Sequence, residues 1–232
     1  MKYSLIIPCY NEAASLSLLL ERCKVLTIHK NIEIILVDNG STDSSARVLS
    51  ELLPYYSNCR SVSVDKNQGY GFGILTGLRA AKGDVLGWTH ADMQTDPGDL
   101  LKAIDIFQAH GNELYVKGRR NVRPLADQLF TTGMSFFETI LLRTYLYDIN
   151  AQPNLFSRRF FESWQNPPHD FSLDLYAYFL ARRQGLSVYR FPVNFGTRIH
   201  GVSHWNVNWA SKMKFIRRTI DYSFELKKRL PP

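Results

Sequence analysis

The sequence predicts an α/β protein with a mostly parallel central sheet flanked by helices. Over the first 120 residues, short apolar runs alternate with segments that carry apolar residues at helical spacing, and Pro, Asn, Gly or Asp bounds each run. The runs are apolar enough for burial on both faces, which is typical of parallel strands covered by helices. The alternation itself also favours a parallel sheet, because parallel strands need a crossover connection.

The expected elements follow one another closely along the chain. Strands are expected at residues 3–7, 33–37, 61–64, 85–89 and 114–117, with helices between them at 13–27, 44–53, 73–81 and 98–110. Beyond residue 120 the pattern predicts helices at 125–143, 171–183 and 206–228, and short strands at 187–189 and 193–196. No repeat or low-complexity linker divides the sequence, so we expect residues 1–232 to form a single domain.

Composition and charge exclude several classes of protein. The three cysteines are an odd number without zinc-ligand spacing, which argues against a disulfide framework or a Cys-based zinc site and favours a reducing cytosol. No apolar run is long enough to span a bilayer. Residues 181–232 hold 11 Lys/Arg and 2 Asp/Glu, against 17 and 19 in the rest. The basic end is therefore expected to face an anion: nucleic acid, a membrane surface or a phosphorylated substrate.

Carboxylates follow three of the predicted strands. Glu12 comes after the first strand, Asp38 after the second and Asp92 after the fourth. In open parallel sheets, ligands bind beyond the carboxyl ends of the strands. Carboxylates at that edge suit hydrogen bonds from base or ribose groups and the coordination of a hard divalent cation. The simpler alternative is that Asp38, Ser41 and Asp43 cap the helix that follows them.

The glycine-rich stretch at residues 67–73 is not a dinucleotide-binding loop. A G-x-G-x-x-G motif beginning at Gly69 would need glycine at position 74, which is Ile74, and one beginning at Gly71 would need it at Thr76. The chain also lacks the G-x-x-x-x-G-K-[ST] motif of P-loop proteins. The glycines more plainly let a helix begin close to another backbone.

Four ordered blocks resemble the family 2 glycosyltransferases, which have the GT-A fold. They are Ser-Leu-Ile-Ile-Pro-Cys-Tyr-Asn-Glu at 4–12, Val-Asp-Asn-Gly-Ser-Thr-Asp at 37–43, Asn-Gln-Gly at 67–69 and Ala-Asp-Met-Gln at 91–94. Within the family, the chain is most similar to dolichol-phosphate mannose synthases and their bacterial polyprenyl-phosphate relatives, which implies a place in cell-envelope polysaccharide biosynthesis. The resemblance covers roughly residues 3–205.

The resemblance implies a role for each matching position. The nucleotide sugar would be held by Pro8, Tyr10, Glu12, Val37, Asp38, Ala91, Asp92 and Gln94. Asp92, with Gln94 and His90, would hold Mg²⁺ or Mn²⁺, and the catalytic candidates are Asp92, Arg120 and Asp170. The diphosphate or acceptor would contact Arg120, Arg198, Ser203 and His204.

The chain departs from the family pattern at several of these positions. His90 stands for the first Asp of the DxD motif, Asn39 for the second Asp of VDDGS, His204 for a Lys, Tyr176 for a common Glu, and Thr131–Thr132 for an Arg. Imidazole is a poor ligand for Mg²⁺, although Mn²⁺ tolerates nitrogen better. We therefore expect Asp92 to carry the metal, with His90 as a weak ligand or a neighbour of the true ligands.

The acceptor decides whether a general base is needed. A polyprenyl phosphate is already anionic at neutral pH, whereas a sugar hydroxyl requires a carboxylate within hydrogen-bond reach. Asp170 and Asp174 are the candidate bases late in the chain. Asp170 could equally cap the helix expected at 171–183, and Asp174 could be an acid favoured by its first turn.

The C-terminal helix bears on the same question. Its apolar stripe comprises Trp205, Trp209, Met213, Ile216, Ile220 and Phe224, flanked by Lys and Arg. A basic amphipathic helix with tryptophans is typical of peripheral contact with a membrane, although the stripe could instead pack on the protein's own core.

The leading hypothesis is an inverting, metal-dependent glycosyltransferase that moves a hexosyl group from a UDP- or GDP-sugar to a polyprenyl phosphate. We expect it in the cytoplasm, at the inner membrane face, where it could depend on a separate membrane subunit. One alternative keeps the donor but uses a glycan or other hydroxyl acceptor. The other is an inactive protein that binds nucleotide sugars or nucleic acid, although no nucleic-acid-binding motif is present.

Overall fold

The computed structural model describes residues 1–121, 125–196 and 209–229. Within these ranges one sheet contains seven strands, in the order β3-β2-β1-β4-β6-β5-β7. The strands are β1 (Tyr3–Cys9), β2 (Ile32–Asn39), β3 (Cys59–Val64), β4 (Val85–Trp88), β5 (Leu114–Asn121), β6 (Asn154–Ser157) and β7 (Ser187–Asn194). All neighbouring pairs are parallel except those of β6 with β4 and β5, so the expected α/β class is confirmed.

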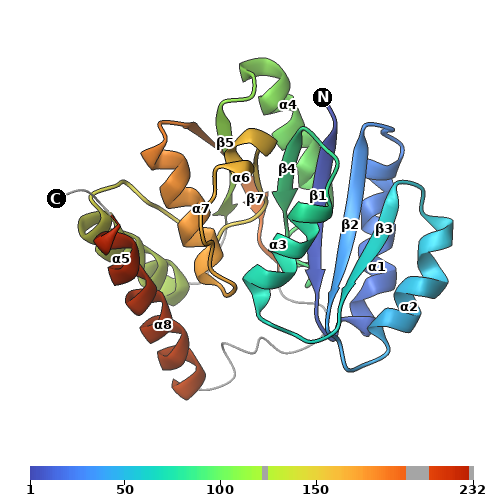
Figure 1. Ribbon diagram of the computed structural model, residues 1–232, viewed down its shortest axis with the longest axis horizontal. Coiled ribbons are helices and arrows are strands. Elements are labelled where there is room, and N and C mark those ends of the chain that lie inside the picture. Colours follow the sequence, from blue (N-terminus) through green and yellow to red (C-terminus); the bar gives the residue numbers. More distant parts are fainter. Residues whose placement is uncertain (122–124, 197–208, 230–232) are drawn as a thin grey trace.

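Helices connect these strands and cover both faces of the sheet (Figure 1). They are α1 (Ala13–Thr27), α2 (Ser45–Leu52), α3 (Tyr70–Ala80), α4 (Leu100–His110), α5 (Leu125–Leu142), α6 (Arg158–Glu162), α7 (Ser172–Arg183) and α8 (Trp209–Lys228). Two short 3₁₀ turns, η1 (Leu53–Tyr55) and η2 (Pro97–Asp99), precede β3 and α4. The expected C-terminal helix is present from Trp209, and residues 206–208 lie outside the described residues.

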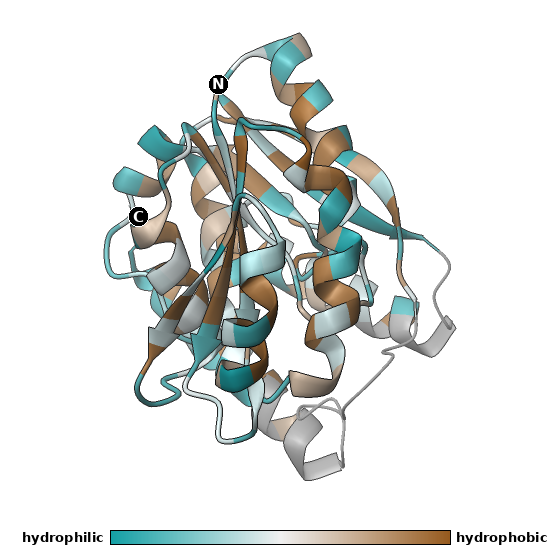
Figure 2. Cartoon of the chain, turned by 90° about the vertical axis from the view of Figure 1, so that its right-hand side faces the viewer, coloured by the Kyte–Doolittle hydropathy of each residue, from teal (hydrophilic) through white to brown (hydrophobic). Residues whose placement is uncertain are grey.

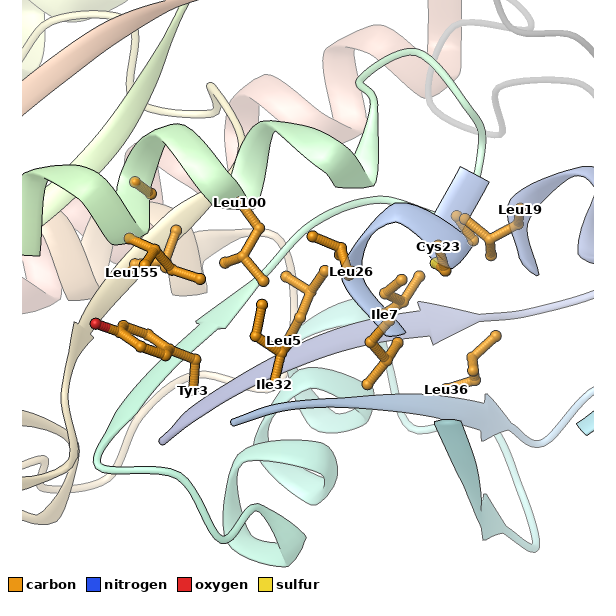
Figure 3. Packing of buried hydrophobic residues seen from close by; sticks show 14 of the residues in the cluster. Tyr3, Leu5, Ile7, Leu19, Cys23, Leu26, Ile32, Leu36, Leu100 and Leu155 are labelled. Carbon is orange, nitrogen blue, oxygen red and sulfur yellow. The ribbon is translucent and has the colours of Figure 1, made fainter. Parts of the chain in front are cut away.

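Alternate side chains of the strands pack in two separate hydrophobic cores, one on each face of the sheet. Leu5 and Ile7 of β1 point to the core formed with α1 and α4, and Ile6 between them points to the core formed with α3 and α7. Figure 3 shows the first of these cores, where leucines of α1 lie over β1 and β2. Because strand side chains alternate between faces, both faces of the sheet need apolar residues, and the hydrophobic colouring of the strands in Figure 2 reflects this.

The end of the chain differs most from the expected elements. The strands expected at 187–189 and 193–196 are one strand, β7, which continues through Pro192. A proline is tolerated there because β7 is at the edge of the sheet, where one side of the strand needs no hydrogen-bond donor. β6 and α6 were not expected from the sequence, because β6 is four residues long and opens with the polar Asn154.

The strand order reverses beside β1, and this defines the functional edge. Along the chain, β1 is followed by β2 and β3 on one side of it, and then by β4 on its other side. Since β1, β2, β4 and β5 run in the same direction, their carboxyl ends meet at one edge. Ligands of such sheets bind at the point where the order reverses. The loops after β1, β2 and β4 are therefore the expected location of a ligand-binding site.

A buried acid lies between α5 and α8, which pack against each other on one side of the molecule (Figure 1). Glu138 of α5 has no exposed surface, and its Oε1 accepts a hydrogen bond from Ser223 Oγ of α8 at 2.7 Å. Among the described residues, no donor reaches its Oε2. Burial raises the pKa of Glu138 to about 7, because the charged carboxylate is poorly solvated there.

The buried acid predicts a pH-dependent effect of Glu138→Gln on stability. The folded chain keeps the Glu138 proton between about pH 4.5 and 7, whereas the unfolded chain releases it, so this group lowers stability as pH rises through that range. Urea unfolding should therefore find the variant more stable than wild type by about 2–3 kcal/mol at pH 8, with little difference at pH 4.5. The exposed Glu225→Gln on α8 serves as the control. The same difference in stability between variant and wild type at pH 4.5 and at pH 8 would contradict the prediction.

Candidate active site

The loops after β1 and β2 are tied together by hydrogen bonds from polar side chains. Asn11, whose φ is +56°, accepts hydrogen bonds at Oδ1 from the backbone N–H groups of Thr42 and Asp43. The Glu12 N–H donates to Ser45 Oγ at 3.0 Å, and the Asn11 N–H donates to Ser41 Oγ at 3.0 Å. These bonds fix the loop that carries Tyr10 and Glu12 against the loop that follows Asp38.

Capping explains one of the two acids in the second loop and not the other. Asp43 accepts from the N–H of Ala13 at 3.2 Å and of Ser45 at 2.9 Å, so it satisfies donors at the starts of both α1 and α2. Asp38 is 6% exposed and accepts at Oδ1 from the Ser41 N–H, which stabilises the turn at the end of β2. It therefore remains available as a candidate for contacts with a ligand.

The Asn39 departure from the family pattern has a structural role. Its Nδ2 donates to the carbonyl oxygen of Gly69 at 2.9 Å, a bond that an aspartate could not make. Gly69 has φ +114°, and a side chain there would collide with the backbone of His169. Asn39 thus links the end of β2 to the Asn-Gln-Gly block that precedes α3.

The loop after β4 presents Asp92 at the same edge. Asp92 is 6% exposed, and its Oδ1 accepts from the Gln94 N–H at 3.1 Å. The Gln94 side chain donates through Nε2 to the carbonyl oxygen of Gly196 at 3.2 Å. Thr89 and Thr95 close the loop through a bond between their hydroxyls at 3.0 Å. His90 is half-buried and stacks on Tyr70, with ring centroids 5.5 Å apart.

The first two blocks meet as the sequence predicts. Pro8 pairs with Val37, and Cys9 pairs with Asp38, across the β1–β2 ladder. The buried Cys9 thiol has a raised pKa, mainly because of burial and also because the charges of Glu12 and Asp38 act on it. The pairing places Asp38 beside the last residue of β1, and Glu12 follows that residue by three positions. Ala91 is buried beside Asp92, one strand away on the other side of β1.

Arg120 is held inside a buried ion-pair cluster at the end of β5. Its Nε donates to Asp148 Oδ1 at 2.8 Å, its Nη2 contacts the same oxygen, and its guanidinium lies 5.3 Å from the centre of the Phe195 ring. Arg190 approaches Asp148 Oδ2 at 3.6 Å. Burial opposes ionisation of Asp148, but the charge and hydrogen bonds of Arg120 outweigh it and hold the pKa of this carboxyl below its usual range.

Asp170 is engaged at both of its oxygens. Oδ1 accepts from the N–H of Ser172, the first residue of α7, at 2.8 Å, although the N-cap residue of α7 is Phe171 and not Asp170. Oδ2 pairs with Arg218 Nε of α8 at 3.1 Å. Tyr176, where the family commonly has Glu, bonds through its hydroxyl to the backbone N–H and carbonyl of Gln165.

A buried polar network around Asp174 was not predicted. Three donors converge on Asp174 Oδ1: Gln152 Nε2 at 2.7 Å, Asn154 Nδ2 at 3.1 Å and Trp88 Nε1 at 3.3 Å. Lys117 is fully buried, and its Nζ donates to Asn154 Oδ1 at 2.7 Å. Burial lowers the pKa of Lys117 to about 7, and the charge of Asp174 partly offsets this. The available signal in the sequence was a charged Lys117 directly after the apolar residues 114–116.

Three predicted phosphate or acceptor residues, Arg198, Ser203 and His204, lie outside the described residues, as does Trp205. Among the residues that the structure describes, no group of three or more His, Cys, Asp or Glu could hold a metal ion. Asp92 is a buried carboxylate in the loop after β4, and its role as a metal ligand stays a prediction.

The sequence profile of "Glycosyl transferase family 2" matches residues 4–160 and so includes the loops after β1, β2 and β4. The chain belongs to this family. The undecaprenyl-phosphate 4-deoxy-4-formamido-L-arabinose transferase of Yersinia enterocolitica is 36% identical over 112 residues, which cover 46% of this chain and 34% of the relative. The corresponding enzyme of Proteus mirabilis is 35% identical over 125 residues, or 52% and 37% of the two chains. The matched part thus spans about a third of the curated relatives' length.

Solved structures confirm the expected GT-A fold of this family 2 glycosyltransferase. Glucosyl-3-phosphoglycerate synthase from Mycobacterium tuberculosis, in complex with UDP, has a TM-score of 0.76 at 19% identity, covering 100% of this chain and 81% of that one. The same enzyme with Mn²⁺, UDP-glucose and phosphoglyceric acid has a TM-score of 0.75 at 18% identity, with the same coverage. The resemblance to the polyprenyl-phosphate branch is also confirmed, because the curated relatives act on undecaprenyl phosphate by name.

The Arg120–Asp148 cluster predicts a large stability cost for Asp148→Asn. This change removes the charge that balances Arg120 and Arg190 while preserving shape, and breaking a buried pair in this way costs about 3 kcal/mol. Urea unfolding of the variant should find that loss. Glu51→Gln, which breaks the exposed 2.7 Å pair with Arg47, should cost less than about 0.5 kcal/mol. Similar small losses in both variants would mean that the buried cluster contributes no more than a surface pair.

Proposed function

We propose that this family 2 glycosyltransferase transfers a hexosyl group from a UDP- or GDP-sugar to a polyprenyl phosphate, with inversion of the anomeric centre. The observation that carries the proposal is the convergence of Glu12, Asp38 and Asp92 on the edge where the strand order reverses. The names of the curated relatives support a polyprenyl phosphate as the acceptor. The titles of the structural neighbours support a nucleoside diphosphate as the donor's leaving group.

The donor would lie across the ends of β2, β1 and β4. Tyr10, Glu12 and Asp38 come from the two loops that the Asn11 hydrogen bonds tie together, so they would receive the base and ribose as one preformed surface. Val37 and Pro8 are neighbours in the ladder beneath them. Carboxylate oxygens accept hydrogen bonds from ribose hydroxyls and base N–H groups, which is the role we assign to Glu12 and Asp38.

Asp92 would hold Mg²⁺ or Mn²⁺ on the donor diphosphate, with Gln94 and His90 beside it. One carboxylate fits this task, because such ions usually combine one or two protein carboxylates with phosphate oxygens and water. The bound ion supplies positive charge to the departing diphosphate. Arg120 would act close by at the end of β5, where Asp148 fixes the orientation of its guanidinium.

The engagement of Asp170 favours a phosphate acceptor. A general base for a hydroxyl acceptor needs a carboxylate oxygen free to receive a proton, and here Oδ1 binds the Ser172 N–H while Oδ2 pairs with Arg218. A phosphate oxygen needs no deprotonation. It would form the new bond to the anomeric carbon while the bond from that carbon to the diphosphate oxygen breaks, and the electron pair would leave with the diphosphate.

An acceptor with a polyprenyl chain requires contact with a membrane, and α5 and α8 supply a suitable surface. Leu129, Phe136 and Ile140 of α5 are 74%, 67% and 60% exposed. On α8, Ser223 and Leu226 are buried, whereas Met213 and Phe224 of the predicted stripe are 46% and 47% exposed. The expected stripe therefore does not pack fully on the core, because the buried line passes through Ser223 and not through Phe224.

Positive charge adjoins these apolar side chains. Arg217, Lys227 and Lys228 of α8 are exposed, and each cation contributes up to about 1 kcal/mol on an anionic membrane surface. No helix in the described ranges combines the length and the apolar character that crossing a bilayer requires. We propose peripheral contact of this surface with the cytosolic leaflet, alone or beside a separate membrane subunit.

The donor and acceptor chemistry predicts the outcome of a direct assay. Purified protein with Mn²⁺ or Mg²⁺ should transfer sugar from one member of a UDP- and GDP-sugar panel to undecaprenyl phosphate in detergent. Asp92→Asn should lower kcat/KM at least about 100-fold, because the loss of the carboxylate removes the charge that holds the ion. The exposed Asp96→Asn, which alters a cap of η2, is the matched control. Transfer only to sugar hydroxyls, or no transfer to any acceptor, would contradict the proposal.

The proposed membrane surface predicts binding to anionic vesicles that depends on the exposed apolar side chains of α5. Phe136→Ser combined with Ile140→Ser should weaken co-sedimentation with phosphatidylglycerol vesicles about tenfold, because it removes exposed apolar side chains from the surface. Ile28→Ser, which alters a side chain 74% exposed at the end of α1, should leave binding unchanged. Equal binding by both variants and wild type would exclude α5 from the contact.

A further inference from the structure

His90 is held by one face of its ring. Its imidazole and the Tyr70 ring are stacked at 28°, with centroids 5.5 Å apart. Among the described residues, no hydrogen bond involves either of its ring nitrogens. Stacking fixes the plane of a ring without using its nitrogens, so both remain available to a ligand. His90 also lies two residues before Asp92, on the loop where the donor diphosphate is proposed to bind.

Tyr70 is itself fixed from three directions. Its other face stacks on Phe171, with centroids 4.5 Å apart at 11°. Its backbone begins α3 directly after Gly69, whose carbonyl oxygen is bonded to Asn39. Its hydroxyl accepts a hydrogen bond from Gln152 Nε2 at 3.2 Å. Tyr70 is therefore a rigid support for the imidazole that rests on it.

The Gln152 amide is locked by the buried network. Nε2 also donates to Asp174 Oδ1 at 2.7 Å, and Oε1 accepts from Asn154 Nδ2 at 2.9 Å. Reversing the amide would oppose two donors at Asn154 and two acceptors at Asp174. The carboxylate of Asp174 thus determines, through Gln152, which group faces the Tyr70 hydroxyl.

The network has an energetic cost that packing alone does not explain. Burying Lys117 and Asp174 in the sheet requires the removal of water from two charges, and apolar residues of similar volume would often be as stable or more so. A fully satisfied polar network does fix a unique geometry. Its path from Lys117 through Asn154, Asp174 and Gln152 ends at Tyr70, directly beneath His90.

We propose that Tyr70, Gln152 and Asp174 are positioning residues that hold His90 as a hydrogen-bond donor to a diphosphate oxygen of the nucleotide sugar. This inference rests on the proposed function. An aspartate at position 90 could reach the diphosphate only through a metal ion, because a carboxylate has no proton to donate, whereas an imidazole N–H can bind the phosphate oxygen directly. His90 would then stabilise the diphosphate alongside the ion held by Asp92, and it would not itself be a ligand of that ion.

A double-mutant cycle on nucleotide binding tests the coupling. Calorimetric titration with UDP and with GDP, each with Mn²⁺, would compare wild type, His90→Ala, Tyr70→Leu and the double variant. We expect His90→Ala to weaken binding at least tenfold and Tyr70→Leu severalfold. The double variant should bind no more weakly than His90→Ala alone, because Tyr70 acts through His90. Tyr70→Phe, which keeps the ring and loses only the hydroxyl, should cost less than Tyr70→Leu.

Tyr115→Phe is the matched control. It removes a hydroxyl that donates to Asn154 Oδ1 at 3.1 Å in the same network, whereas the Tyr115 ring packs on Phe156, Phe160 and Tyr178 and not on His90. Its affinity should stay within twofold of wild type. Pulsed electron paramagnetic resonance of the Mn²⁺–nucleotide complex should find no nitrogen coupled to the metal.

The outcomes separate the inference from the proposed function. Additive losses from His90→Ala and Tyr70→Leu, an equal loss in Tyr115→Phe, or a metal-coupled nitrogen that His90→Ala abolishes would each overturn the positioning role while leaving glycosyl transfer intact. Wild-type protein that binds neither UDP nor GDP would overturn the proposed function and this inference together.

Discussion

The parallel pairing of β1 with both β2 and β4 is the constraint on which the rest of this structure depends. It brings three loops to one edge, and it does so through backbone hydrogen bonds that are indifferent to the ligand. The loops then need only short-range bonds to become a defined surface. Asn11, Ser41 and Ser45 supply these between the first two loops, and the Thr89–Thr95 bond closes the third. A nucleotide would thus meet groups that are already ordered, which reduces the entropy lost on binding.

The two halves of the sheet are stabilised in different ways. At β1 and β2 the strands are mostly apolar, and their side chains fill cores on both faces, whereas the edge strand β3 alternates polar with partly buried apolar residues. On the β4-β6-β5-β7 side, two buried polar clusters replace part of the apolar packing: Arg120 and Arg190 around Asp148, and Lys117 near Asp174. Such clusters add little net stability but fix orientation. They lie in the half of the sheet nearest the proposed diphosphate and acceptor, where orientation matters for group transfer.

The pairing of Arg218 with Asp170 connects the proposed membrane surface to the proposed catalytic edge. Arg218 belongs to α8, and its guanidinium also lies 5.6 Å from the centre of the Phe171 ring, which in turn stacks on Tyr70. A lipid-bound acceptor held near α5 and α8 would therefore lie beside residues in contact with the His90 support. This continuity gives a physical reason for α8 to be packed on α7 and α5 and not to extend from the domain as a separate anchor.

Periodicity and short motifs in the sequence determined the α/β class, the first five strands and the family, because alternating apolar runs and the residues after strand ends are local properties of the chain. They also placed Glu12, Asp38 and Asp92 at a common edge, since parallel strands leave no other arrangement. Only the tertiary structure decided the partners of Arg120, the double engagement of Asp170 and the path from Lys117 to His90. These depend on contacts between residues tens of positions apart, such as Trp88 with Asp174 and Arg120 with Asp148, and no local pattern encodes which distant side chain will satisfy a buried charge.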